Sequence, residues 1–67
     1  MKEIYITIID YIEEKYITDL DIPINCIPQI GEELKIWNEG RWGVYKVTEI
    51  SKTINLDSEL ELEIAVI

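Results

Sequence analysis

The stretch that decides the fold is Glu33-Leu34-Lys35-Ile36-Trp37-Asn38-Glu39-Gly40-Arg41-Trp42-Gly43-Val44-Tyr45-Lys46-Val47. Two runs in which apolar and polar residues alternate flank a short loop that contains Gly40, and this pattern predicts a β-hairpin. Both tryptophans of the chain, Trp37 and Trp42, lie at the shoulders of this loop. The hairpin is therefore the clearest element of local structure in the sequence.

Two registers are open for this hairpin. A three-residue loop, 38–40, with Gly40 left-handed in a bulge sets Trp37 opposite Arg41. That register turns Trp42 and Val44 inward and turns Tyr45 and Val47 outward. The turn chemistry favours this register.

A loop with Glu39-Gly40 at its tip instead sets Trp37 opposite Trp42. It pairs Leu34 with Tyr45, and it gathers one apolar face from Leu34, Ile36, Tyr45 and Val47. A slip of one residue moves every side chain to the other face, so only one register can hold. We favour the second because it keeps Lys46 out of the core, where an unpaired lysine would cost several kcal/mol, roughly what a whole small domain has to spare.

The composition favours an all-β fold of one domain, residues 1–67. The chain has 67 residues, of which 48% are hydrophobic, and it contains no phenylalanine. Most core-type positions hold isoleucine, and β-branched side chains fit a pleated sheet better than a helix. A chain of this length lies near the lower limit for folding on its own core.

The rest of the chain predicts further strands. Alternation from Ile4 to Asp10 indicates a first strand. Residues 11–18 are ambiguous: Asp10 to Glu13 has the form of a helix capping box, but 13–15 can instead be a turn into a second strand, Tyr16 to Ile24, which we favour. Pro23 and Pro28 bracket a segment that is an edge or an irregular loop. The last strand alternates as follows: Leu60, Leu62, Ile64 and Val66 with Glu59, Glu61, Glu63 and Ala65.

The net charge of −8 is unevenly distributed. Residues 34–53 hold four bases against two acids and are net +2, whereas the remaining chain holds twelve acids against two lysines and is net −10. This balance argues against nucleic acid and against an anionic membrane surface as partners, and it favours a basic partner. Cys26 is the only cysteine, and no signal peptide or membrane-spanning run is present, so we expect a cytoplasmic protein.

Catalytic chemistry is not indicated. The chain has no histidine, which removes His-dependent triads and the usual zinc sites. The row Glu59, Glu61, Glu63 spaces its carboxylates too far apart along a strand to wrap one cation, so we expect a solvated strand face. Cys26 has no neighbouring base and is expected to be a partly buried, inert thiol. We expect no enzyme activity, no cofactor and no metal.

The best candidate site is Trp37, Arg41 and Trp42, as a protein-interaction surface. Tryptophan and arginine are the residue types most enriched at binding hot spots. The competing interpretation is that two cross-strand tryptophans stabilise a marginal hairpin. Both interpretations can hold together.

One resemblance extends over most of the chain. Ile27-Pro28-Gln29-Ile30-Gly31-Glu32, then an apolar strand, a glycine turn, Tyr45-x-Val47-x-x-Ile50 and a terminal alternating strand, resembles the layout of small, mostly uncharacterised bacterial and phage proteins with an SH3-like five-stranded β-barrel. The resemblance implies a small antiparallel, partly open barrel and no active site. Trp37 and Trp42 are not part of that layout.

Two functions are therefore expected from the sequence. The first is a non-catalytic protein-interaction or structural module that uses a Trp-flanked basic hairpin on an acidic barrel. Its partner is another protein or, in a homodimer, a second copy of the chain. The alternative is an acidic, phage-type inhibitor whose carboxylates imitate nucleic-acid phosphates on a host enzyme. The two differ in surface: the first depends on the tryptophans, the second on the acidic strands.

Overall fold

The computed structural model describes residues 2–67, and all of its regular structure except one short turn is β. The elements are β1 (Glu3–Asp10), β2 (Lys15–Pro23), a 3-10 turn η1 (Ile24–Cys26), β3 (Glu33–Asn38), β4 (Arg41–Ile54) and β5 (Leu60–Val66). No helix within this part of the chain is long and apolar enough to cross a membrane.

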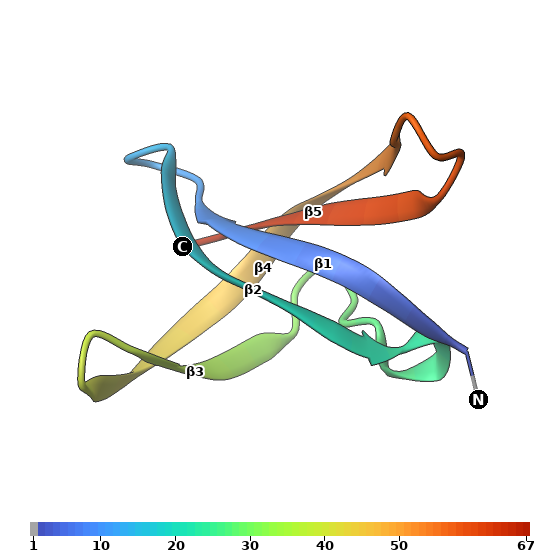
Figure 1. The fold of residues 1–67 in the computed structure, drawn as a ribbon. Coiled ribbons are helices and arrows are strands. Elements are labelled where there is room, and N and C mark those ends of the chain that lie inside the picture. Colours follow the sequence, from blue (N-terminus) through green and yellow to red (C-terminus); the bar gives the residue numbers. More distant parts are fainter. Residues whose placement is uncertain (1) are drawn as a thin grey trace.

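The five strands form one strongly curled sheet in the order β2-β1-β5-β4-β3 (Figure 1). The expected all-β, partly open barrel with five strands is confirmed, and the curled sheet is consistent with a small SH3-like barrel. One feature differs from the antiparallel expectation: β1 and β5 pair in parallel, with Ile6 opposite Leu62 and Ile8 opposite Ile64. Parallel neighbours need a crossover connection, and here β2, β3 and β4 together provide it.

The core lies on the inner face of this sheet. β1 contributes alternate isoleucines to it, as the 4–10 pattern predicts. Its buried members are Ile4, Ile6, Ile8, Ile17, Ile36, Val47, Leu62, Ile64 and Val66. Ala65 is also buried, although the alternation of the last strand assigns it to the outer face. The opposite strand residue is Glu49, next to a bulge in β4, and the bulge disturbs the simple inside–outside alternation.

Residues 11–18 form a turn and a strand, as favoured, and not a helix. The capping interaction that suggested a helix is nevertheless present: the backbone N–H groups of Ile12 and Glu13 both donate to Asp10 Oδ1, at 2.9 and 3.0 Å. Glu14 then takes a left-handed backbone with φ of 54°, which ends the turn and directs the chain into β2. The same local hydrogen bonds can therefore start a helix or close a hairpin.

The β3–β4 hairpin adopts the second of the two registers. Leu34 lies opposite Tyr45 and Trp37 opposite Trp42, with Glu39 and Gly40 alone at the tip. Both tip residues have positive φ, 54° and 78°, as a two-residue type I′ turn requires. Lys46 is consequently exposed, which agrees with the reason for favouring this register.

Candidate functional site

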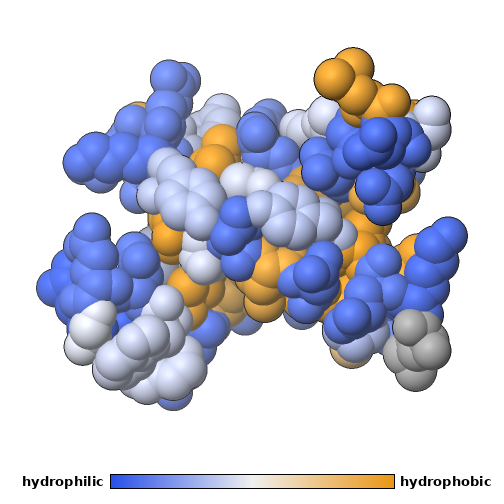
Figure 2. Space-filling view, in the orientation of Figure 1, coloured by the Kyte–Doolittle hydropathy of each residue, from blue (hydrophilic) through white to orange (hydrophobic). Residues whose placement is uncertain are grey.

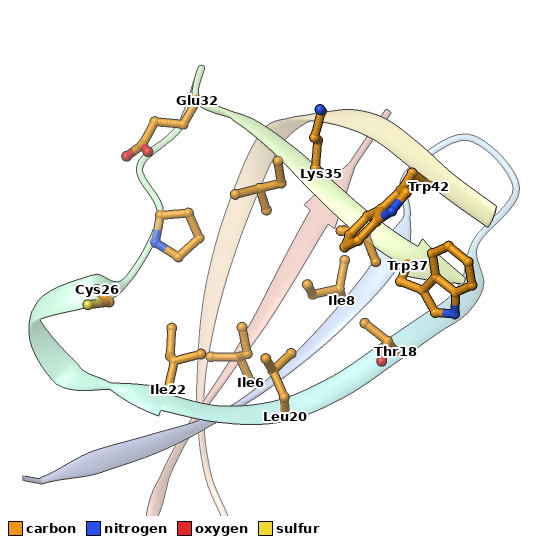
Figure 3. Close-up of a pocket in the computed structure, with 13 residues that line it drawn as sticks. Ile6, Ile8, Thr18, Leu20, Ile22, Cys26, Glu32, Lys35, Trp37 and Trp42 are labelled. Atoms are coloured by element: carbon orange, nitrogen blue, oxygen red, sulfur yellow. The ribbon is translucent and has the colours of Figure 1, made fainter. Parts of the chain in front are cut away.

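The sheet does not close on itself, because β2 pairs only with β1 and β3 pairs only with β4. Between these two edges lies an apolar groove of about 430 Å³, here called the β2–β3 groove. Ile6 and Ile8 of β1 lie at its floor. Its walls come from alternate residues of the two edge strands, which are Thr18, Leu20 and Ile22 on β2 and Leu34 and Ile36 on β3 (Figure 3).

The two ends of the groove differ in chemistry. Trp37 and Trp42 lie at one end, and Cys26 lies at the other (Figure 3). Glu32 and Lys35 are the charged residues of the lining. The groove therefore offers an aliphatic channel with an aromatic end, which suits an apolar or peptide-like ligand better than a small charged one.

The tryptophans form one aromatic unit. Their ring centroids are 5.3 Å apart and their planes meet at 73°, an edge-to-face arrangement. Trp37 is 57% exposed and Trp42 is 64% exposed, although they are the largest apolar side chains of the chain. Edge-to-face pairs of this kind generally favour a hairpin, and the exposure leaves most of both indoles open to solvent.

Arg41, the third predicted site residue, lies apart from this groove. It is exposed and pairs with Asn38 directly beside the Glu39-Gly40 tip. It does not belong to the residues that line the groove. The hairpin thus joins the two tryptophans closely, and Arg41, in the next residue pair, projects from the other face of the hairpin.

The sequence did not indicate that Leu20, Ile22 and Cys26 line one groove with the tryptophans. Leu20 and Ile22 alternate with Asp19 and Asp21 along β2, which indicates a strand with one buried face. The alternation does not indicate which other strand packs against that face. Cys26 was expected to be partly buried but is exposed, and its Sγ lies 3.6 Å from the side-chain oxygen of Asn25. Cys26 ends the 3-10 turn η1, in which no residue is buried.

A second feature is an acidic outer face on β2, β1 and β5. Tyr5 of β1 lies between Asp21 and Glu61, and Thr7 lies between Asp19 and Glu63. In β1, β2 and β5, and in β4 from Glu49 to Thr53, the residues that share this face in the pairing register include no lysine or arginine. Lys46, which alternates with the buried Val47, lies further along β4 on the same side. These four carboxylates, Asp19, Asp21, Glu61 and Glu63, are called the acidic face below.

Asp19 is held by two tyrosines on this face. The Tyr5 hydroxyl donates a hydrogen bond to the Asp19 carboxylate, and this bond and one from Tyr16 lower the pKa of Asp19. The same hydrogen bond is the largest cause that raises the pKa of Tyr5 to about 12. Asp19 is therefore ionised at neutral pH. Within residues 2–67, no group of three or more His, Cys, Asp or Glu side chains is arranged to hold a metal ion.

Polar and apolar side chains both reach the surface of the protein. Figure 2 shows hydrophilic side chains over much of the projecting surface, an apolar group that projects at the upper right, and apolar atoms in the hollows between the projections. No family model matches this sequence, and neither the comparison with curated proteins nor that with solved structures found a match.

Proposed function

We propose that the protein is a non-catalytic, cytoplasmic protein-interaction module that binds its partner through Trp37, Trp42 and the β2–β3 groove. The observation that carries the proposal is the exposure of the paired indoles at the end of an apolar groove. Large aromatic side chains at the edge of a concave apolar surface are typical of binding hot spots. Arg41, beside the hairpin tip, favours an acidic residue at the one point of the partner that faces the tip.

The test is capture of a partner from an extract of the host cell. Immobilised protein should retain a partner, and the double variant Trp37→Ala/Trp42→Ala should lose most of it while keeping a folded β spectrum by circular dichroism. The matched control is Ile54→Ala/Leu56→Ala, which removes two exposed apolar side chains at the last residue of β4 and in the turn that follows it. Equal capture by the tryptophan variant and the wild type would contradict the proposal.

A second candidate is an inhibitor that imitates nucleic acid, and the acidic face favours it. Four carboxylates on neighbouring strands, with no base on the same face of those strands, offer a repeated negative charge to a basic enzyme. Capture of a basic nuclease or polymerase should then weaken steeply as salt rises, because phosphate-like contacts are screened. Glu61→Gln/Glu63→Gln should weaken it more than Glu13→Gln/Glu14→Gln, which changes the charge equally in the β1–β2 turn. Capture that does not respond to salt would exclude this candidate.

A further inference from the structure

The inner face of β2 is only partly covered. Leu20 lies opposite Ile6 in the β1–β2 register, yet Ile6 is buried and Leu20 is 42% exposed. The difference arises because β1 has a neighbour on each side, whereas β2 has one only on the β1 side. Figure 3 shows the Leu20 side chain projecting into the groove beside Ile6. One more strand beside β2 would cover this side chain.

The free edge of β2 is long enough to accept such a strand. Between the bulge at Ile17 and Pro23, β2 continues over residues 18–22 in regular register with β1. An edge strand leaves a row of backbone N–H and C=O groups unpaired on its outer side, and an extended peptide can pair with them. Pro23 has no N–H and limits the pairing at that end.

The side chains of this edge specify the chemistry of an added strand. Inward-pointing residues of the added strand would lie beside Leu20 and Ile22, where apolar side chains pack well. Its outward-pointing residues would lie beside Asp19 and Asp21, where lysine or arginine gives favourable cross-strand pairs. The Tyr5 hydrogen bond keeps Asp19 in its charged form.

We infer that the β2 edge of the groove binds an extended segment of a partner protein in which apolar residues alternate with lysine or arginine, and that this segment adds to the sheet as a sixth strand. This inference rests on the proposed function and specifies the partner. The opposite edge, β3, carries Glu33 and Lys35 on its outer face and so has no preferred sign of charge. A second copy of the chain is disfavoured because each copy carries a net charge of −8.

The tryptophans and Cys26 serve as built-in reporters, since they are the only residues of their kinds and lie at the two ends of the groove. The probe is a capped peptide of about six residues that alternates lysine and valine, the length of a typical strand. It should shift tryptophan emission saturably and slow the alkylation of Cys26. A peptide with glutamate for lysine, and one with a central proline, should each bind at least about tenfold more weakly.

Each control peptide separates one cause of binding. Equal binding of the proline peptide would show that charge alone attracts the peptide and would overturn strand addition. Equal binding of the glutamate peptide would overturn the charge preference. Sedimentation equilibrium on the free protein tests for a dimer. A stable dimer that no peptide dissociates, in which Cys26 is already protected from alkylation, would assign the groove to a second copy of the chain and overturn the inference.

Two variants of equal charge change locate the peptide. Asp21→Lys, on the β2 edge, should largely abolish the preference for the lysine peptide, because it leaves the charge of Asp19 opposed by a lysine on the same edge. Glu63→Lys, on β5 and two strands away, should leave the preference for the lysine peptide unchanged. If both variants weaken lysine-peptide binding equally, the net charge and not the β2 edge attracts it. If the lysine peptide does not bind but partner capture still requires Trp37 and Trp42, only this inference is overturned. If partner capture does not require the two tryptophans, the proposed function is overturned.

Discussion

Trp37 and Trp42 lie directly opposite each other across the β3–β4 hairpin, in edge-to-face contact with ring centroids 5.3 Å apart. The contact spans the last pair but one before the Glu39-Gly40 turn, so it supports the hairpin at its most distant end from the core. The same two side chains line the end of the β2–β3 groove. One pair of residues therefore stabilises the hairpin and forms the proposed interaction surface.

The tryptophan pair should contribute a measurable coupling energy. In a double-mutant cycle of Trp37→Ala, Trp42→Ala and both together, we expect about 0.5–1.5 kcal/mol of coupling in the free energy of unfolding, as edge-to-face aromatic pairs give. Urea unfolding monitored by circular dichroism measures it. Strictly additive effects of the two substitutions would show that the indoles do not support each other.

The tip of the hairpin should be stabilised by substitution of Glu39. Its φ of 54° is left-handed, which is strained for glutamate and better tolerated by asparagine. Glu39→Asn should therefore raise the free energy of unfolding by roughly 0.5–1 kcal/mol. Glu13→Asn removes the same charge from a turn position without positive φ and should change stability little. Equal gains in both variants would point to charge relief and not to turn geometry.

Gly43 should not tolerate a side chain. A Cβ at this position would lie 2.7 Å from Cε2 of the Tyr45 ring, which covers the glycine. Gly43→Ala should destabilise the protein by about 1–3 kcal/mol, as overpacking does. The cost should largely disappear in a Tyr45→Ala background, because the clashing ring is gone. An unchanged cost in that background would assign the effect to the backbone.

The Tyr5–Asp19 hydrogen bond should make stability depend on pH at both extremes. The pKa of Tyr5 is raised from 10.0 to about 12, so its stabilising contribution is complete below pH 10 and is lost as the pH rises from 10 to about 12. The pKa of Asp19 is lowered from 3.8, so its contribution is present above that value and is lost as the pH falls through the lowered pKa.

Tyr5→Phe should flatten both limbs of this profile, measured as the free energy of unfolding against pH. Tyr11→Phe removes a phenol from the β1–β2 turn and leaves Asp19 with both of its tyrosines, so it serves as the control. A wild-type profile in Tyr5→Phe would show that the hydrogen bond does not contribute to folding.

Local pattern was sufficient to predict the strands and the register of the central hairpin. Alternation placed β1, β2 and β5 within a few residues of their observed bounds, because one side of each strand must be apolar. The burial cost of Lys46 chose the hairpin register correctly against the apparent preference of the turn. The strand positions and the hairpin register depend on residues that are close in sequence and on which side chains can be buried.

The candidate site was predictable only in part. Trp37 and Trp42 could be placed opposite each other from the hairpin alone, but Leu20, Ile22 and Cys26 could not be joined to them. Those residues reach the groove because β2 and β3 are the two ends of the same curled sheet. Strand order is set by contacts between residues far apart in sequence, and no local pattern records it.

The sequence by itself determined where the strands lie, which of their faces are apolar, and how the two tryptophans pair across a tight turn. Only the tertiary structure decided that β1 and β5 run parallel, that β2 and β3 remain unpaired edges, and that an apolar groove opens between them. The physical reason is that side-chain alternation specifies burial for each strand separately, whereas closure of a barrel depends on the twist and order of all five strands together.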